Sequence, residues 1–134
     1  MADNNPMPAQ DVAQLTIEKI YLKDLSIENP GAPQSFKLAE APQIEVGLRT
    51  ATEALEPAIY ESVLTMTVTA RIGDKTMFLV EASQAGIFSI RGVSDQQLGL
   101  VLATHCPTVL FPYVRETIAD ATTGMDFPRI HLSP

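Results

Sequence analysis

The feature that most constrains the fold is a helical pattern near the C-terminus, the only long one in the sequence. From Leu98 onward, mostly apolar residues recur in steps of three or four, a spacing that places them on one face of a helix. They form two rows, Leu98, Val101, Leu102, His105, Val109 and Tyr113 in one and Leu110, Val114, Ile118 and Ala121 in the other. One row can pack on a sheet of the same chain. The other needs a second cover, for which a partner subunit is the simplest candidate.

The limits of this helix are marked by capping residues. Ser94 or Asp95 can cap its start, and Gly124 is expected to end it. Two prolines, Pro107 and Pro112, lie inside the pattern. Because a proline lacks an N–H and crowds the preceding turn, we expect a break or kink near Pro107.

Four strand-like segments come before the helix. They cover residues 14–28, 43–53, 59–72 and 75–88. Alternating apolar and polar positions and many β-branched side chains are typical of strands. Strands grouped before a single helix predict an α+β fold, with a four-stranded antiparallel sheet and a long, kinked C-terminal helix packed on one face.

The connections between these segments differ in kind. Residues 29–42 hold several prolines around Phe36, which predicts a long crossover loop between the first and second strands rather than a hairpin. Residues 50–57 are interpreted as a polar connection. Gly73 and Asp74 supply a tight turn between the third and fourth strands. Gly86 and Gly92 are expected at structural turns.

Strict alternation divides the first strand between two faces. One face then carries Leu15, Ile17, Tyr21, Leu25 and Ile27, and the other carries Thr16, Glu18, Ile20, Leu22, Asp24 and Glu28. On this prediction Ile20 and Leu22 place apolar groups on an otherwise polar face.

Composition limits the possible partners and compartments. The net charge of −7 argues against binding to nucleic acid or to anionic membranes. A single cysteine fits a reducing compartment, and no signal peptide or apolar run of about 18 residues is expected. We therefore predict a cytoplasmic protein without direct membrane insertion. Residues 1–12 are expected to be a disordered arm, and residues 13–134 a single domain.

No residue pattern predicts catalysis, a metal site or a cofactor. His105 and Cys106 are adjacent, so on a helix they point about 100° apart, and Cys106 is expected to be a small buried residue. Asp24, Glu28 and Glu81 are expected to form a solvated acidic face rather than a carboxylate pair. We predict that the chain is not an enzyme. Its apolar surfaces predict either oligomer formation or the binding of apolar ligands.

Three segments resemble the SecB family of bacterial protein-export chaperones. They are Ile20–Pro33 (IYLKDLSIENPGAP), Gln84–Ile90 (QAGIFSI) and Cys106–Glu116 (CPTVLFPYVRE). The resemblance covers roughly residues 14–134. It implies a four-stranded antiparallel sheet with helical cover and a homotetramer built as a dimer of dimers. It also implies a holdase that binds unfolded secretory precursors in an apolar groove and delivers them to the SecA ATPase, without a cofactor.

The same resemblance implies roles for individual residues. The surface that contacts SecA would comprise Asp24, Glu28, Leu79 and Glu81. The client groove would comprise Tyr21, Phe36, Ile44, Val46 and Leu48. The tetramer interface would comprise Val80, Ala82, Gln84, Cys106, Leu110 and Tyr113.

The sequence departs from the family pattern in two places. Family members commonly carry an aromatic residue two positions before the loop proline, where this chain has Glu40 before Pro42. The family continues beyond the position of Pro134 into a short amphipathic helix and an acidic tail, so those parts are either truncated here or absent. Two alternatives stay open: a SecB-like chaperone of a toxin–antitoxin system, and a non-chaperone oligomeric domain such as a hot-dog-type thioesterase.

Overall fold

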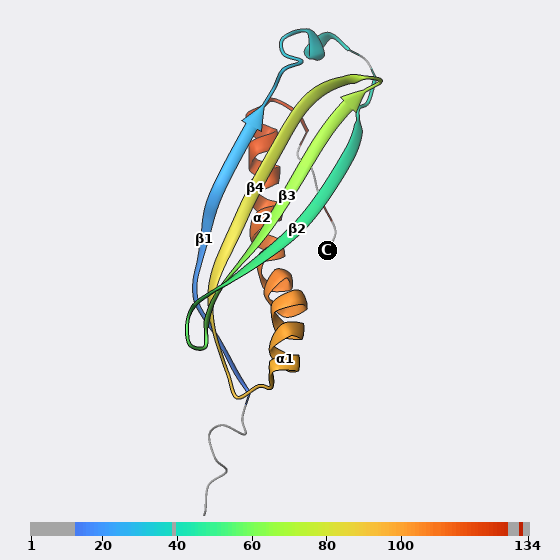
Figure 1. Ribbon diagram of the computed structural model, residues 1–134. Helices are drawn as coiled ribbons and strands as arrows, with labels where there is room; N and C mark the ends of the chain where they lie inside the picture. The colour runs from blue at the N-terminus through green and yellow to red at the C-terminus, as the bar shows by residue number, and fades with distance from the viewer. Residues whose placement is uncertain (1–12, 39, 129–131, 133–134) are drawn as a thin grey trace, which may run out of the picture.

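The computed structural model describes residues 13–38, 40–128 and 132 (Figure 1). Four antiparallel strands form one sheet in the order β1-β4-β3-β2, and a long helix packs on one face of it. The strands are β1 (Gln14–Glu28), β2 (Gln43–Glu56), β3 (Ile59–Ile72) and β4 (Lys75–Arg91). The helix comprises α1 (Asp95–Leu100), a π-helical turn (Val101–His105) and α2 (Cys106–Gly124). The predicted fold class is confirmed.

The connections follow from the strand order. Because β1 and β2 are the two edge strands, the segment between them must cross the end of the sheet, as predicted, and it contains a short 3₁₀ helix, Gln34–Lys37. The predicted polar connection at residues 50–57 is wrong. Instead β2 runs on to Glu56, and a two-residue turn ends at Ala58, whose φ is 67°. Threonines in this segment suit a strand because their β-branched side chains fit a pleated surface.

The core lies between the helix and the two central strands. Every second residue of β3 and β4 points toward the helix, where Met66 pairs with Ala82 and Val68 pairs with Val80. The helix contributes one narrow row that is fully buried against them. It comprises Cys106, Leu110, Val114 and Ile118. This row is essentially the second of the two predicted helical rows, and the first row remains half-buried or exposed.

The helix begins, and departs from regular α-helical geometry, where the sequence indicated. Ser94 forms a capping box, since its Oγ accepts a hydrogen bond from the Gln97 N–H at 3.1 Å while Gln97 Oε1 accepts one from the Ser94 N–H at 3.0 Å. Before Pro107, the Cys106 N–H bonds to the carbonyl of Val101, five residues back. This π-helical turn is the irregularity expected near Pro107, and the helix continues through it.

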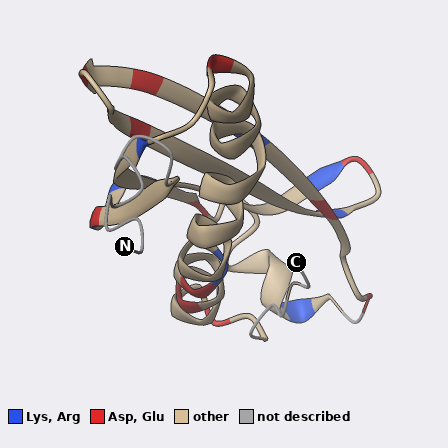
Figure 2. Cartoon of the chain, turned by 90° about the horizontal axis from the view of Figure 1, so that it is seen from below, with Lys and Arg blue, Asp and Glu red and all other residues tan. Residues whose placement is uncertain are grey.

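The helix is more apolar than predicted. Asp95–Gly124 spans 30 residues and contains an 18-residue window with a mean hydropathy of 1.2, so by length and composition alone it could cross a membrane. It still holds no uninterrupted apolar run of about 18 residues, as expected, because Thr104, His105 and Thr108 interrupt the apolar sequence. Figure 2 shows the middle of the helix without charged residues, in agreement with the sequence from residue 96 to residue 114. The burial of its central row against the sheet accounts for part of this apolar character.

Two bulges correct the predicted faces of β1. The pairing with β4 shifts between Ile17 and Lys19 and again between Leu22 and Asp24. Each bulge reverses the direction of the side chains that follow. Residues on the helix side are Leu15, Ile17, Ile20, Leu22, Leu25 and Ile27, judged by their partners on β4. Tyr21 therefore lies on the opposite, outer face of the sheet. Ile20 and Leu22 lie on the helix side, so they do not place apolar groups on the polar face as predicted.

Gly86 permits the close packing of helix on sheet. It lies inside β4 rather than at the expected turn. A Cβ atom built there would lie 2.7 Å from the Phe88 ring and 3.1 Å from Leu110. No side chain larger than hydrogen fits without moving the helix or the ring.

We predict that Gly86→Val lowers the free energy of unfolding by about 1–3 kcal/mol, because it overpacks this contact. Gly47→Val is the matched control, since Gly47 lies in β2 and a Cβ there meets nothing within 4 Å. Urea denaturation followed by circular dichroism measures both. Equal effects at the two glycines would contradict the packing argument.

Candidate functional site

An apolar track runs along one edge of the helix side. Ile44, Val46 and Leu48 point to that side from edge strand β2, and all three are exposed because the helix covers only the central strands. Ile44 pairs with Ala70, and Ile72 follows on the same face of β3. Ile72 in turn lines a pocket of about 210 Å³ under the crossover loop. We call the three β2 residues the β2 row and this cavity the crossover pocket.

The crossover pocket is walled by aromatic and aliphatic side chains. Its lining is Ser35, Phe36, Leu38, Glu40, Pro42, Ile72, Met77 and Phe127. Phe127 stacks on Phe36 and Phe78, with ring centroids 5.8 and 4.8 Å apart. Phe36 remains half exposed. Glu40 stands where the family pattern suggested an aromatic, so this pocket wall is partly acidic.

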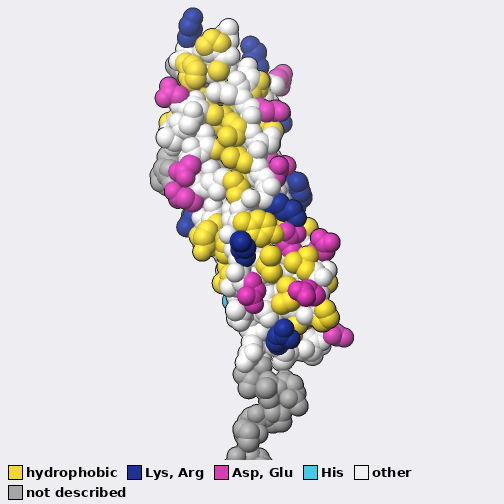
Figure 3. Space-filling model, turned by 90° about the vertical axis from the view of Figure 1, so that its left-hand side faces the viewer, with side chains coloured by type: hydrophobic (Ala, Val, Ile, Leu, Met, Phe, Trp, Pro, Cys, Tyr) yellow, Lys and Arg dark blue, Asp and Glu magenta, His cyan; other side chains and the backbone are white. Residues whose placement is uncertain are grey.

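A second apolar surface lies along the opposite edge. β1 exposes Ile17, Leu22, Leu25 and Ile27 on the helix side. Figure 3 shows hydrophobic side chains in a stripe along this side of the molecule, with charged side chains on both flanks. Between β1 and α2 lies an open groove of about 580 Å³. It is lined by Ile20, Tyr21, Leu22, Gln84, Pro112, Tyr113, Glu116, Thr117 and Asp120.

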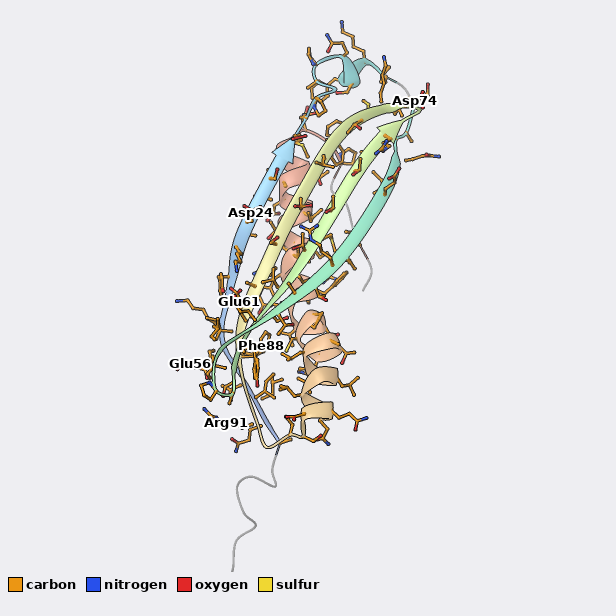
Figure 4. The ribbon with its side chains drawn as sticks, in the orientation of Figure 1. Asp24, Glu56, Glu61, Asp74, Phe88 and Arg91 are labelled. Carbon is orange, nitrogen blue, oxygen red and sulfur yellow. The ribbon has the colours of Figure 1, made fainter. Side chains whose placement is uncertain are left out.

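The outer face of the sheet, away from the helix, carries the predicted acidic surface. Glu28 of β1 pairs with Leu79 of β4, and Ser26 pairs with Glu81. Asp24, labelled in Figure 4, pairs with Ser83, next along β4 on the same face. The pairing thus brings together the four residues predicted to contact SecA: Asp24, Glu28, Leu79 and Glu81. We call them the acidic patch.

Within the acidic patch, the Glu81 carboxylate already has two partners. It accepts a hydrogen bond from Thr67 Oγ1 at 2.8 Å and forms an ion pair with Arg49 at 3.4 Å. These contacts, the threonine hydrogen bond first, lower the pKa of Glu81. The Arg49 contact could not be predicted from sequence patterns, because β2 and β4 do not pair directly and β3 lies between them.

A buried carboxylate on the same face holds β1 against the sheet. Glu61 of β3 is 8% exposed and accepts hydrogen bonds from Tyr21 and, at 2.7 Å, from Lys23. The bonds from Lys23 and Tyr21 lower the pKa of Glu61. The bond to Glu61 also raises the pKa of Tyr21 to about 12. Tyr21, predicted for the client groove, therefore hydrogen-bonds on the outer face and is not brought together with Phe36 or the β2 row.

Most residues predicted at the tetramer interface lie inside the protein's own core. Val80, Ala82, Cys106 and Leu110 have no exposed surface, and Gln84 is almost fully buried. Direct contact of these residues with another subunit is thus corrected, because the helix and the sheet of the same chain bury them between them. They can affect assembly only through the shape of the surface above them. Tyr113 alone of this set is exposed.

The Cys106 thiol has low chemical reactivity. Burial raises the pKa of the Cys106 thiol to about 11, which leaves it protonated near neutral pH. Among residues 13–38, 40–128 and 132, no group of three or more His, Cys, Asp or Glu side chains could hold a metal ion. His131 lies outside the described residues. The apolar track, the open groove and the acidic patch are suited to binding.

Comparison with known proteins points to one family. The family model described as preprotein translocase subunit SecB matches residues 8–134 of this sequence. A protein-export protein SecB from Methylobacillus flagellatus is 48% identical over 134 residues, which is 100% of this chain and 85% of that protein. One from Thiobacillus denitrificans is 51% identical over 118 residues, 88% of this chain and 78% of that protein.

A solved structure shares the fold. The Mycobacterium tuberculosis SecB-like chaperone, in complex with a ChAD peptide from the HigA1 antitoxin, matches with a TM-score of 0.71 at 16% sequence identity. The match covers 90% of this chain and 89% of that chain. At this identity the likeness shows the fold alone.

The Glu61 contacts generate a pH prediction. Because the pKa of Glu61 is lowered from 4.5 in the folded protein, its contribution to stability is present above about pH 4.5 and is lost as the pH falls through the lowered value. We expect Glu61→Gln to cost about 1–3 kcal/mol of unfolding free energy at pH 7. The gap to the wild type should narrow below pH 4.5. Urea denaturation across pH 7 to 3 measures it.

The control is Glu18→Gln, which removes the same charge from an exposed position on β1. This variant should follow the wild-type pH dependence. A gap between wild type and Glu61→Gln that stays constant down to pH 3 would contradict the assigned role of the Glu61 carboxylate.

Proposed function

The chain belongs to the SecB family of protein-export chaperones, and we propose that it holds unfolded secretory precursors along the β2 row and delivers them to SecA. Family members are chaperones and not enzymes, which confirms the prediction that the chain is not an enzyme. The observation that carries the proposal is the apolar track of the β2 row, left exposed beside the helix and leading into the crossover pocket.

The track suits an extended polypeptide. Side chains on one face of a strand recur about every 6.6 Å, so the β2 row spans roughly 13 Å and repeats at the period of an extended client. Each 100 Å² of apolar client surface buried there contributes about 2.5 kcal/mol. Ordering the client offsets much of this gain. The net result is moderate affinity with little dependence on client sequence, as a chaperone of many precursors requires.

Binding of this kind needs no chemical energy. A protein that binds only unfolded chains removes them from the folding and aggregation equilibria by mass action. The buried, protonated Cys106 thiol and the absence of a metal-binding group among the described residues fit this passive role. We expect no nucleotide and no cofactor to take part.

We assign the β1 side to contacts between copies of the chain. The exposed β1 residues and Tyr113 of α2 form an apolar surface on both sides of the open groove. β1 is also an edge strand, whose free backbone groups can pair with a second copy. The family resemblance supports a homotetramer built as a dimer of dimers. Burial between copies would also explain why the helix is so apolar.

We assign the acidic patch to SecA. Asp24, Glu28 and Glu81 supply negative charge around the apolar Leu79 on adjacent strands. Because the patch and the β2 row lie on opposite faces of the sheet, one protein can hold a client and a basic partner together. The acidity of the whole chain, with a net charge of −7, supports a basic partner.

Export is favoured over a toxin–antitoxin role. The relatives at 48% and 51% identity are named protein-export proteins, whereas the antitoxin-bound chaperone is only 16% identical. The order of four strands followed by a helix also disagrees with a hot-dog fold, whose central helix comes early.

We further propose a cytoplasmic location without membrane insertion, because the central row of the apolar helix is buried on the sheet.

Native mass spectrometry tests the holding function. We predict a complex of four copies that gains the mass of one unfolded precursor and, at stoichiometric excess, suppresses precursor aggregation without ATP.

Val46→Glu should keep four copies but weaken precursor binding about tenfold or more, because it places a charge in an apolar contact. Gly47→Glu, on the other face of the same strand, is the control. A monomer that ignores denatured chains contradicts the proposal, and selective capture of an antitoxin favours the alternative.

The separation of the two faces yields a further prediction. Asp24→Lys should weaken SecA binding about tenfold at low salt, because it inverts one charge of the acidic patch, while precursor binding stays within about twofold. Asp74→Lys makes the same charge change at the β3–β4 turn, at the end of the sheet (Figure 4), and should change neither. Equal loss of both activities in Asp24→Lys would argue against separate faces. Biolayer interferometry measures both.

A further inference from the structure

We propose that Arg49 is an internal competitor for the acidic patch: its guanidinium occupies the Glu81 carboxylate until a basic partner displaces it. This inference rests on the proposed docking of SecA to the patch. It adds a residue that sets how tightly the partner binds. Arg49 was not among the residues that the family resemblance assigned.

The sheet register places Arg49 to make this contact. Arg49 pairs with Thr65 of β3, and Glu81 pairs with Thr67 of the same strand. The arginine therefore reaches diagonally across β3 from the edge strand to β4. The β3 residues beneath it are threonines, whose short side chains leave room for the arginine to lie over them.

The geometry is that of a contact that can open. The two guanidinium nitrogens lie 3.4 and 3.5 Å from the two carboxylate oxygens, longer than a tight charge-assisted bond. The Arg49 side chain is 66% exposed and that of Glu81 is 31% exposed. Exposed ion pairs of this kind are weak, so a partner can replace the arginine at small cost. The 2.8 Å hydrogen bond from Thr67 holds the carboxylate in place while the cation is exchanged.

Charge makes the competition selective for cationic partners. A lysine or arginine of the partner that approaches Glu81 meets the positive Arg49 before it reaches the carboxylate, and it gains Glu81 only by moving Arg49 aside. The other cation beside the patch, Lys23, donates at 2.7 Å to the buried Glu61. Among residues 13–38, 40–128 and 132, Arg49 is thus the cation that shares a carboxylate of the acidic patch.

A matched pair of variants tests the proposal. Arg49→Gln and Arg71→Gln remove the same charge from the same two-strand ribbon. Arg71 pairs with Glu45 at 3.3 Å and lies four residues along β3 from Thr67, roughly 13 Å away. We expect Arg49→Gln to tighten the binding of purified SecA about two- to fivefold at 50 mM salt, with little gain at 500 mM. Arg71→Gln should change affinity much less.

Two further readouts fix the contact. In the absence of partner, Arg49→Gln should raise the pKa of the Glu81 carboxyl, followed by nuclear magnetic resonance, whereas Arg71→Gln should leave it unchanged. On a Glu81→Gln background, Arg49→Gln should give no gain in affinity. Thermal unfolding of each variant confirms that it folds.

The outcomes separate this inference from the proposed function. Wild-type protein that does not bind SecA overturns the docking assignment and the inference with it. Normal binding that is unchanged or weakened by Arg49→Gln overturns the inference alone, and weakening would make Arg49 a direct contact. Equal gains in SecA affinity from Arg49→Gln and Arg71→Gln would show that the effect comes from net charge alone, and they would overturn the inference that Arg49 competes for Glu81.

Discussion

The packing of one helix across two of four strands is the constraint on which the structure depends. Cys106, Leu110, Val114 and Ile118 form a single row that fits against β3 and β4, and Gly86 lets the helix approach closely. One helix is about 10 Å wide, whereas four strands at about 4.8 Å spacing are wider. Both edge strands therefore keep apolar side chains that no other part of the described chain covers. The exposed surface on each edge is a direct result of this mismatch.

The two faces of the sheet offer different kinds of contact. On the helix side, burial of apolar area favours loose and adaptable contacts with extended chains or with further copies. On the outer face, the contacts are ionic and depend on position: Glu61 fixes β1, and Glu81 is shared between Thr67 and Arg49. Such contacts are screened by salt and change with charge, whereas apolar burial is not screened by salt. The division gives the protein two kinds of binding surface that do not overlap.

Sequence patterns predicted the four strands followed by a helix, the crossover loop and the helix cap, because these depend on local signals such as alternation, proline content and the Ser94 box. Sequence patterns did not predict features that depend on contacts between residues far apart in the sequence. The predicted second strand ends too early, because threonines occur in polar loops as well as in strands. The predicted face of Tyr21 is wrong, because bulges leave no mark in the sequence. Position in a strand does not reveal that the helix covers Val80 and Ala82, which excludes direct contact with another subunit but not an effect on assembly. The Arg49 contact needed the three-dimensional register.

The two bulges in β1 tie its halves together in a way that restricts how this edge can change. Only the short segment from Lys19 to Leu22 is out of phase with the rest of the strand, and the second bulge restores the original phase. Loss of one bulge without loss of a residue would turn every later side chain over, placing Leu25 and Ile27 on the outer face and Asp24 on the helix side. Deletion of the extra residue itself, Glu18 at the first bulge or Lys23 at the second, would instead straighten the strand and leave the faces of the other residues unchanged. β1 can therefore lose a residue at a bulge but not between the bulges, so its length is fixed by the face that each side chain must reach.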